Sequence, residues 1–575
     1  MPVGNSRVRL RHPVKGVFSK YFTQHEAHTR HVLLYRQTPA TIYRLMLFFF
    51  RFLHSDLVLP FREINLPMSN RLHSEKTVKT SPRVRTGVPG LDDILCGGLS
   101  QNRVYLVEGS PGAGKTTLAL QFLMEGVRNG EKGLYITLSE TAEELQEIAD
   151  SHGWSIDQLF LFQLVNDLGL DPDSEQSILH PSELELGETT KSIISEVNRV
   201  SPARVVFDSL SEMRLLAQNP LRYRRQILAI KNYFSTRKCT VILLDDKTSE
   251  PGDQQLHSIA HGVITLEQLA QEFGKERRRL NVVKMRGIKF RGGYHDFILD
   301  TGGIMVFPRL IAAEHGRDFS PVMRPTGSSG LDELLGGGLV PGTSTLFVGP
   351  SGIGKTTLSI QAVLAALERG ERAALYLFDE GLGTLFARSA ALGMDIRPYI
   401  DSGELLIKHI DPAELAPGEF AHILRDAVEN IGVSFIVIDS LNAYLQAMPG
   451  EKYLTLQMHE LLAYLNQQGI TTVLVLGQHG LIGEVRSEVD LSYLSDATVL
   501  LRFFEANGRM HRAITVIKSR TNDHAQSIHE LRFAANGIEI GEALEGFEGV
   551  LTGLPTYRGE TPMMRAQKEN NVTRA

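Results

Sequence analysis

One long segment of this chain occurs twice, and the duplication limits its fold more than any other feature of the sequence. The stretch TGVPGLDDIL at residues 86–95 returns as TGSSGLDELL at residues 326–335, an offset of 240 residues. A glycine-rich turn follows each copy, GGL at 97–99 and at 337–339. Repeats of roughly 20–50 residues build solenoids or propellers. A period of 240 residues instead predicts two whole domains of one fold in tandem.

Both copies alternate apolar, strand-like runs with amphipathic helices, a pattern typical of parallel α/β units. Strands are expected at residues 103–108, 133–138, 204–208 and 240–244 of the first copy, and at 344–348, 373–378, 435–439 and 472–476 of the second. A β-rich end follows in each copy, at 280–286 and 294–299, then at 512–519 and 528–534. The predicted fold class is α/β, with a central, mostly parallel sheet in each of two domains, 81–315 and 316–555.

Each copy contains a complete P-loop, which predicts nucleotide binding. GSPGAGKT and GPSGIGKT both follow an expected strand and open an expected helix, the context that the motif requires. Backbone N–H groups wrap the phosphates, the lysine reaches the β- and γ-phosphates, and the threonine hydroxyl holds Mg²⁺, here Thr116 and Thr356. A chance glycine-rich turn is the alternative, which two matches in register make negligible. The predicted ATP-binding residues are Gly109, Ser110, Pro111, Gly112, Ala113, Gly114, Lys115, Thr116 and Thr117, with Gly349, Pro350, Ser351, Gly352, Ile353, Gly354, Lys355, Thr356 and Thr357.

A second signal is an acid at the end of a hydrophobic strand after each P-loop. RVVFD ends at Asp208, and FIVID ends at Asp439. In P-loop NTPases a carboxylate at this place acts on the shell of the magnesium ion. An aspartate that caps a buried strand is the alternative. The position after a P-loop in both copies favours the nucleotide site, so both acids are predicted to belong to it.

Hydrolysis also needs a group that orients or deprotonates water. The strand after the P-loop helix ends in TLSE in the first copy and in LFDE in the second. At the offset of 240, Ser139 aligns with Asp379 and Glu140 with Glu380. We predict catalytic roles for Glu140, Asp379 and Glu380. The alternative is N-capping of the next helix by Ser139 or Asp379, with acids in its first turn.

Near the end of each copy, an expected strand carries a Lys-x-Arg motif. The residues are Lys284 and Arg286 in the first copy, Lys518 and Arg520 in the second. Alternation along a strand places both basic side chains on one face. Such a pair is suited to project into the phosphate site of a neighbouring subunit, as an arginine finger does. The alternative is a solvated basic edge of a sheet; repetition favours the catalytic role in trans.

Together these motifs resemble the KaiC family, tandem RecA-like ATPases named for a circadian-clock protein. The resemblance covers about residues 81–555, and its most specific features are the Thr-Gly-x-x-Gly-Leu-Asp segment before each P-loop and the late Lys-x-Arg strands. The stretch GEALEGFEGVLTGLPTY at 541–557 also resembles the end of many such proteins. The resemblance implies two RecA-like domains in a double-ring homohexamer, with ATP between adjacent subunits. The four basic residues would then serve the neighbour's nucleotide.

The resemblance also implies Ser/Thr autokinase activity in the second domain. KaiC carries adjacent serine and threonine acceptors just before a Thr-Asp-Thr segment. The matching stretch here is SYLSDA, in which Ser492 falls on the serine acceptor and Tyr493 replaces the threonine. One phosphoacceptor is therefore expected, with other signalling proteins as partners. Because Ser139 replaces one acid of the family's pair, slow or altered hydrolysis is expected in the first domain.

The N-terminal extension, residues 1–80, lies outside the family pattern. Residues 1–67 carry ten Lys/Arg against three Asp/Glu, a net charge of +7, which leaves −13 for the rest of a chain whose total is −6. Charges interrupt the apolar patches between 41 and 61, unlike a membrane-spanning helix, and a signal-peptide cleavage site is missing. We expect a disordered or loosely helical extension, or an artefact upstream of a start at Met68. A basic amphipathic membrane anchor is the alternative. The tail, 556–575, is also expected to be disordered.

Charge and cysteine content weigh on the competing functions. A net charge of −6 argues against nucleic acid as a partner, because phosphate contacts drive such binding. The two cysteines, Cys96 and Cys239, cannot build the four-cysteine zinc module of RadA-type repair proteins, and they fit a reducing, cytoplasmic setting. A RecA- or RadA-like DNA-dependent ATPase is therefore the second hypothesis. An ATP-gated scaffold with little turnover is the third.

Overall fold

The computed structural model describes residues 82–164, 181–217, 219–247, 254–271, 273–446, 453–478, 492–506, 508–552 and 555–558. The N-terminal extension, with its alternative interpretation as a membrane anchor, lies outside these residues, as does most of the expected C-terminal tail. The first residues of that tail form strand β22 (Thr556–Tyr557), which pairs with β21 (Phe547–Glu548). Among the described helices, none combines the length and apolar character needed to cross a bilayer.

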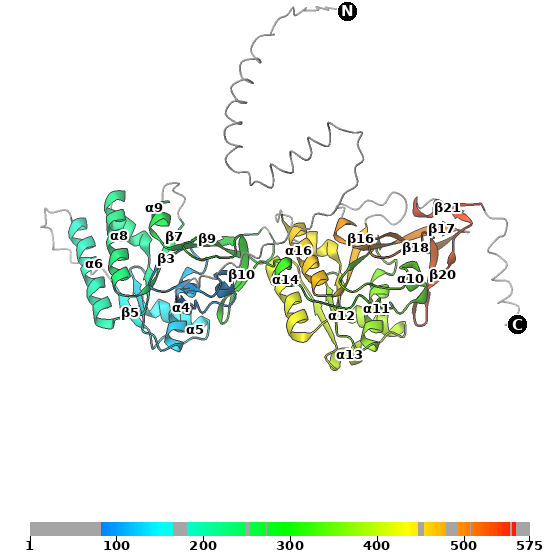
Figure 1. Cartoon of the computed structure of the whole chain (residues 1–575), viewed down its shortest axis with the longest axis horizontal. Helices are drawn as coiled ribbons and strands as arrows, with labels where there is room; N and C mark the ends of the chain where they lie inside the picture. The colour runs from blue at the N-terminus through cyan, green and yellow to red at the C-terminus, as the bar shows by residue number, and fades with distance from the viewer. Residues whose placement is uncertain are drawn as a thin grey trace, which may run out of the picture. The chain divides into compact units, whose positions relative to one another are not determined.

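The first domain is built on a mixed sheet of nine strands in the order β11-β10-β9-β8-β3-β7-β6-β4-β5 (Figure 1). The strands β3 to β8 pair in parallel, and β9, β10 and β11 extend the sheet in antiparallel fashion beyond β8. Their bounds are β3 (Val104–Gly109), β4 (Gly133–Thr137), β5 (Phe160–Gln163), β6 (Arg204–Asp208), β7 (Thr240–Asp246), β8 (Gly262–Leu269), β9 (Arg277–Met285), β10 (Tyr294–Asp300) and β11 (Gly303–Phe307).

The second domain repeats this arrangement strand for strand, in the order β14-β13-β15-β16-β12-β17-β18-β19-β20. Its strands are β12 (Ser344–Pro350), β13 (Ala373–Leu377), β14 (Leu405–His409), β15 (Phe435–Asp439), β16 (Thr471–Gln478), β17 (Ala497–Ala506), β18 (Arg509–Ser519), β19 (His529–Ala534) and β20 (Gly537–Ala543). The predicted α/β class and the duplication are confirmed. Each sheet also holds three strands that the hydrophobic pattern did not reveal, β5, β8 and β11 in the first and β14, β17 and β20 in the second.

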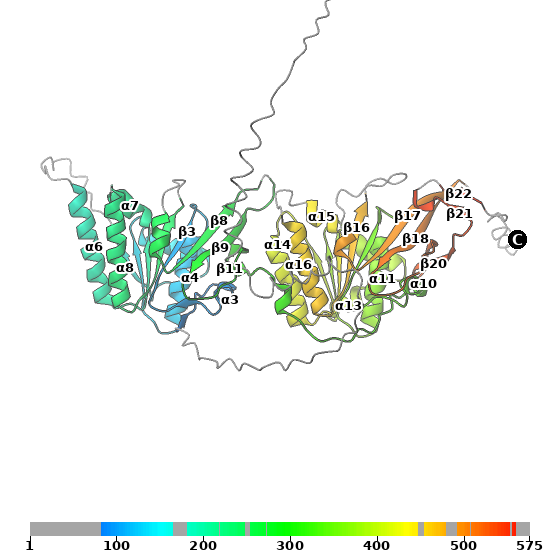
Figure 2. The same cartoon turned by 45° about the horizontal axis from the view of Figure 1, so that its top comes forward.

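Helices cover both faces of each sheet (Figure 2). In the first domain α3 (Leu91–Ile94), α4 (Lys115–Arg128) and α5 (Ala142–Ser151) pack on one face, against the side chains of Tyr105 and Val107. The other face, with Val104 and Leu106, is covered by α6 (Pro181–Val200), α7 (Leu210–Ala217), α8 (Pro220–Thr236) and α9 (Gln254–Ile259). Burial on both faces explains why the parallel strands are almost uniformly apolar.

The second domain has the same two layers. On one face lie α10 (Ser329–Leu334), α11 (Lys355–Glu368), α12 (Leu382–Ala391) and the short α13 (Arg397–Asp401). On the other lie α14 (Pro417–Asp426), α15 (Leu441–Gln446) and α16 (Leu454–Gln467). Smaller elements are β1 (Arg83–Val84), β2 (Leu99–Ser100), η2 (Ala312–Glu314), η3 (Ala427–Ile431), η4 (Ser492–Leu494) and η5 (Val550–Thr552).

The carboxyl ends of the parallel strands meet at one edge of each sheet. There the P-loop follows β3 or β12, and the acids predicted from the motifs follow the neighbouring strands. In open α/β sheets ligands bind at this edge. The topology therefore gathers the predicted nucleotide residues of each copy into one place.

Candidate active sites

The P-loops begin two helices whose first turns are free to face a phosphate. Gly114 and Gly354 are the N-cap residues of α4 and α11, with φ of 96° and 119°. These left-handed values suit glycine because it has no Cβ. Among the described residues, no side chain caps either helix, so the N–H groups of the first turn remain available to an anion.

The P-loop lysines are buried in both domains, but their partners differ. Lys115 Nζ donates to the carbonyl oxygens of Gly109 (3.0 Å) and Ser110 (3.1 Å) and forms an ion pair of 2.8 Å with Asp246. Lys355 Nζ donates to the corresponding carbonyls of Gly349 (2.8 Å) and Pro350 (2.9 Å). Burial lowers the pKa of Lys355, and the charge of Asp439 opposes this shift.

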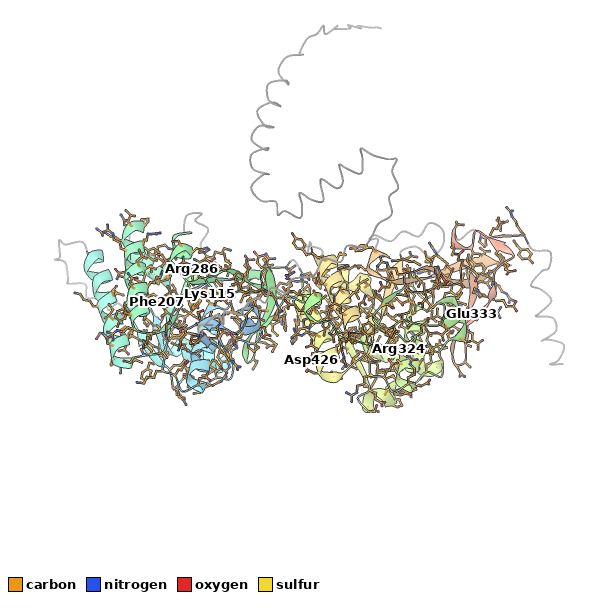
Figure 3. The ribbon with its side chains drawn as sticks, in the orientation of Figure 1. Lys115, Phe207, Arg286, Arg324, Glu333 and Asp426 are labelled. Atoms are coloured by element: carbon orange, nitrogen blue, oxygen red, sulfur yellow. The ribbon has the colours of Figure 1, made fainter. Side chains whose placement is uncertain are left out.

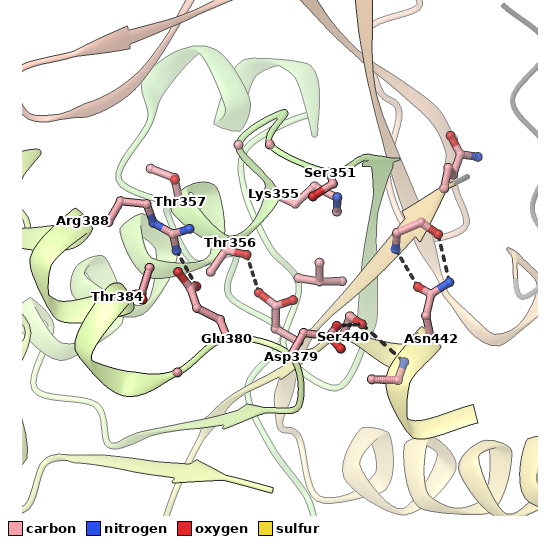
Figure 4. A pocket seen from close by; sticks show the side chains of 18 of the residues that line it. Ser351, Lys355, Thr356, Thr357, Asp379, Glu380, Thr384, Arg388, Ser440 and Asn442 are labelled. Atoms are coloured by element: carbon pink, nitrogen blue, oxygen red, sulfur yellow. Dashed lines mark hydrogen bonds and ion pairs between the residues drawn. The ribbon is translucent and has the colours of Figure 1, made fainter. Parts of the chain in front are cut away.

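The remaining P-loop residues divide between cavity and core. In the second domain Ser351, Gly352 and Thr357 line a cavity of about 810 Å³, together with the lysine and the predicted acids (Figure 4). The side chains of Ala113 and Ile353 are fully buried in the hydrophobic cores instead. They anchor the loops, so only their backbone groups remain for a phosphate. Pro111 and Gly112 lie in the turn before α4, and Thr117 is buried within that helix.

Asp208 lies at the end of β6, where the motif predicted it. Its carboxylate accepts a 2.5 Å hydrogen bond from the hydroxyl of Tyr135 on β4. Burial raises the pKa of Asp208, while the bond from Tyr135 and the charge of Lys115 oppose the rise. A hydroxyl donor, Tyr135, and the nearby positive charge of Lys115 therefore support a carboxylate that is almost fully removed from water.

Asp439 occupies the equivalent place at the end of β15, with a different donor. The hydroxyl of Thr356 donates to its Oδ2 at 2.6 Å. The pKa of Asp439 is raised to about 6, mainly by burial and to a smaller extent by the charges of Glu380 and Asp379, against the opposing effects of Thr356 and Lys355. The predicted magnesium ligand and the predicted acid are thus already in contact in the second domain.

Glu140 contacts Thr116, the threonine of the first P-loop. Thr116 Oγ1 donates to its Oε1 at 3.4 Å. Its other oxygen, Oε2, is buried, and no group of the described residues forms a hydrogen bond with it. Burial, followed by the charge of Asp208, raises the pKa of Glu140 to about 7. A buried carboxylate with one open oxygen and a pKa near neutrality has the properties of a general base.

In the second domain both predicted acids already have partners. Asp379 accepts a 2.5 Å hydrogen bond from the hydroxyl of Ser440. Glu380 forms a 2.9 Å ion pair with Arg388, which lies two turns into α12 (Figure 4). At the offset of 240, the first domain has Ile148 in place of Arg388. The motifs did not predict Arg388, because a basic residue on an amphipathic helix resembles an ordinary solvated position.

The helix-capping alternative for Ser139 and Asp379 is wrong. The N-cap of α5 is Thr141, which forms a capping box with Glu144. The N-cap of α12 is Gly381. Ser139 and Asp379 precede these caps by two residues and lie in the turns after β4 and β13.

The four basic residues of the Lys-x-Arg motifs each donate to a backbone carbonyl in or next to α9 or η4. Lys284 and Arg286 donate to the backbone carbonyls of His257 and Ser258 at the end of α9. In Figure 3, Arg286 lies above Lys115 in the first domain. The lysines are the second-last residues of β9 and β18, whereas Arg286 and Arg520 fall just beyond these strands.

The second motif contacts the segment that contains the predicted phosphoacceptor. Lys518 Nζ donates to the carbonyl oxygen of Ser495 at 2.7 Å, and Arg520 donates to that of Tyr493 at 3.4 Å. Ser492 begins the short helix η4 in this segment. Its backbone is described, but its side chain lies outside the described atoms. The cavity of the second domain is lined by other residues than these.

Asp246 was also missed, although the sequence held a signal for it. Glu140 and Glu380 are 240 residues apart, but Asp208 and Asp439 are only 231 residues apart. The second copy is therefore shorter than the first by nine residues between these two positions. The offset of 231 carries Asp246 to Gly477, a change from an acid to no side chain at all. The structure gives the same equivalence, because Asp246 pairs with Gly109 and Gly477 pairs with Gly349.

The residues present suit ATP and a magnesium ion. The phosphates would meet the N–H groups at the start of α4 and α11 and the two buried lysines. The ion would meet hydroxyl and carboxylate oxygens, Thr116 with Asp208 in the first domain and Thr356 with Asp439 in the second. Such hard oxygen donors are those that Mg²⁺ prefers.

Comparison with known proteins agrees with this geometry. A family model described as "ATPase: KaiC" matches residues 84–311 and again 324–545. The chain is 26% identical over 490 residues to the circadian clock protein KaiC3 of Synechocystis sp., covering 84% of this chain and 96% of the relative. It is 28% identical over 501 residues to the circadian clock oscillator protein KaiC of Thermostichus vulcanus, covering 86% and 95%. Because the family model spans most of the chain in two successive copies, the chain belongs to the KaiC family of ATPases.

Proposed function

We propose that both domains bind Mg-ATP and that the first domain performs most of the hydrolysis. The observation that carries this proposal is the state of the two acids. Glu140 has an open, buried oxygen and a pKa of about 7, whereas Glu380 is engaged by Arg388. An open carboxylate can accept a proton from water, and an ion-paired one must first leave its partner. This assignment is the reverse of the slow first domain expected from Ser139.

In the first domain the chain's own groups would act as follows. Lys115 and the N–H groups of α4 bind the phosphates, and Thr116 and Asp208 hold the metal shell. Glu140 takes a proton from a water molecule while the oxygen of that water forms a bond to the γ-phosphorus. The bond from that phosphorus to the β–γ bridging oxygen breaks, and ADP leaves with inorganic phosphate. Mg²⁺, when bound, neutralises charge that develops on the phosphate oxygens.

The second domain would retain ATP longer. Its cavity presents the same lysine, threonine and strand-end aspartate, so binding is supported. Arg388 holds Glu380 away from the role that Glu140 plays, which makes hydrolysis slower. Because of the ion pair between Arg388 and Glu380, the hypothesis of an ATP-gated scaffold with little turnover applies to the second domain only.

We also infer self-association, as a homohexamer in which subunits share nucleotide sites. The four Lys-x-Arg residues donate to backbone carbonyls at the ends of α9 and η4. The same placement of the motif in both domains supports a shared role toward a neighbour's nucleotide. The names of the relatives, circadian clock proteins, support a role in signalling or timing with other signalling proteins as partners.

Autophosphorylation of Ser492 is the remaining part of the proposal. Lys518 and Arg520 hold the backbone just after Ser492, so this serine lies beside the groups proposed to face the neighbour's ATP. Transfer would join the serine oxygen to the γ-phosphorus and release ADP, with the hydroxyl proton passing to a carboxylate. Intact-mass measurement after incubation with Mg-ATP should show one added phosphate, absent in Ser492→Ala.

Phosphate release by purified chain with Mg-ATP tests the central proposal. We expect Lys115→Ala to remove most steady-state hydrolysis and Lys355→Ala to leave most of it, while native mass spectrometry of the unchanged protein gives six subunits. Equal losses in the two variants would contradict the division between the domains. Strong stimulation of hydrolysis by DNA would instead favour the hypothesis of a DNA-dependent ATPase.

A further inference from the structure

The P-loop lysine of the first domain has a carboxylate partner from a different strand. Asp246 is the last residue of β7, and its Oδ1 lies 2.8 Å from Lys115 Nζ. The lysine side chain is only 10% exposed and the aspartate 33%. The pair therefore lies at the mouth of the site, where solvent screens it only in part.

Neighbouring contacts hold Asp246 in this position. Its backbone N–H donates to Ser211 Oγ at 3.1 Å, and that hydroxyl lies 3.3 Å from Asp246 Oδ2. Ser211 also donates to Asp245 at 3.0 Å, and Asp245 accepts from Arg214 at 2.7 Å. Because this network fixes the aspartate at the end of β7, moving it away from Lys115 has a cost.

The second domain shows what the site is like without this acid. Its register partner for Gly349 is Gly477, so a backbone hydrogen stands where Asp246 carries a carboxylate. Among the described residues, no carboxylate lies within ion-pairing distance of Lys355, which donates to backbone carbonyls. A Cβ built on Gly477 would first meet Asn442 Oδ1 at 3.5 Å, an ordinary contact, so the backbone there accepts a Cβ without a clash.

A phosphate and the Asp246 carboxylate make the same demand on Lys115. Both groups present anionic oxygens that accept hydrogen bonds from the Lys115 ammonium group, and the phosphates of ATP need its positive charge for binding. Binding of ATP must break or weaken the ion pair and bring two anions close together. The bound state therefore gains less free energy at the first site than at the second.

We propose that Asp246 is an affinity-determining residue, an internal competitor of the ATP phosphates for Lys115 that makes the first site the weaker of the two. The inference rests on the proposed binding of ATP by the first P-loop. Weak binding and an open Glu140 then belong together, since a site that turns ATP over must also release its products. The second domain, without the competitor, holds nucleotide more tightly.

Reciprocal substitutions in the full-length chain test the inference by binding, not by turnover. Asp246→Asn is made in a Lys355→Ala chain, and binding of a fluorescent ATP analogue with Mg²⁺ is followed by anisotropy. Removing the competing charge should tighten binding at the first site by about tenfold. The matched control is Gly477→Asp in a Lys115→Ala chain, which should weaken binding at the second site by about the same factor.

The outcomes distinguish a failure of the inference about Asp246 from a failure of the proposed ATP binding by the first P-loop. If Lys355→Ala binds the analogue and Asp246→Asn leaves or weakens the affinity, Asp246 is not a competitor, although the proposed function stands. If Lys355→Ala binds none and Asp246→Asn does not restore binding, ATP binding by the first P-loop is itself wrong. Thermal melting checks that each variant folds, and the Gly477→Asp arm decides the inference should Asp246→Asn not fold.

Discussion

The two domains share a phosphate cradle and a strand order, but they carry different charges where their central strands end. In the first domain, Glu108 lies one residue before the end of β3, and β7 ends with Asp245 and Asp246. By register, the second domain has Val348, Leu476 and Gly477 at these places. The backbone groups that wrap a phosphate hardly depend on side chains, so the cradle persists in both. The surrounding charges are free to differ, and we propose that they set how each site uses ATP.

At the motif positions that follow β4 and β13, the second domain has more acids than the first, the reverse of the difference where the central strands end. Of the two motif positions that follow β4, only Glu140 is an acid, and its Oε2 forms no hydrogen bond with the described residues; both motif positions that follow β13 are acids, Asp379 and Glu380, and both have neighbouring partners. On the proposed division of activity, the number of acids in the motif matters less than whether one carboxylate can accept a proton.

The largest expected effect is on Glu140. In the Lys355→Ala chain, Glu140→Gln should lower ATP turnover by about 1000-fold, because a well-placed general base contributes roughly 10²–10⁴-fold. The matched variant is Glu380→Gln in the Lys115→Ala chain, for which we expect a far smaller loss. Phosphate release at saturating ATP is the measurement. Similar losses at both sites would break the comparison between the domains.

The pH dependence of ATP turnover at the first site should reflect the ionisation of Glu140. With a pKa raised by burial to about 7, Glu140 is largely protonated at pH 6 and largely ionised at pH 8. Only the ionised form accepts a proton, so turnover in the Lys355→Ala chain should rise about tenfold between these pH values. Nucleotide binding measured in parallel controls for other groups. A flat profile would mean that another group deprotonates the water.

A smaller effect is expected from the Arg388–Glu380 pair. Arg388→Ile places the residue of the first domain, Ile148, at the equivalent position of α12 and frees the carboxylate. In the Lys115→Ala chain turnover should rise about two- to fivefold, since a partly exposed ion pair contributes up to about 1 kcal/mol. Arg388→Lys keeps the charge and should change little. A fall in turnover would show that Arg388 assists catalysis at the second site.

The smallest effect concerns stability and not chemistry. Thr141 and Glu144 form a capping box at the start of α5, so Thr141→Ala should lower the free energy of unfolding of the first domain by about 1 kcal/mol. Gly381→Ala tests the equivalent place in the second domain, where the structure describes no side-chain cap, and should change stability less. Denaturant titration measures both. Equal losses would mean that the box contributes little.

The amino-acid sequence by itself determined the two P-loop domains, their mostly parallel sheets and the placement of Asp208, Asp439 and Glu140. It could do so because these features are local: a glycine-rich loop between strand and helix, and an acid directly after an apolar run. The additional strands, such as β8 and β17, were missed because their apolar character alone does not separate them from buried helix.

Only the tertiary structure decided which acids have hydrogen-bond or ion-pair partners and which P-loop lysine is paired with a carboxylate. Asp246 and Lys115 lie 131 residues apart in the sequence and meet because β7 pairs with β3. Arg388 and Glu380 are closer in the chain, yet their contact depends on how α12 leaves the turn after β13. Charge pairs form through space across packed elements, so the electrostatics that distinguishes the two sites could not be derived from motifs.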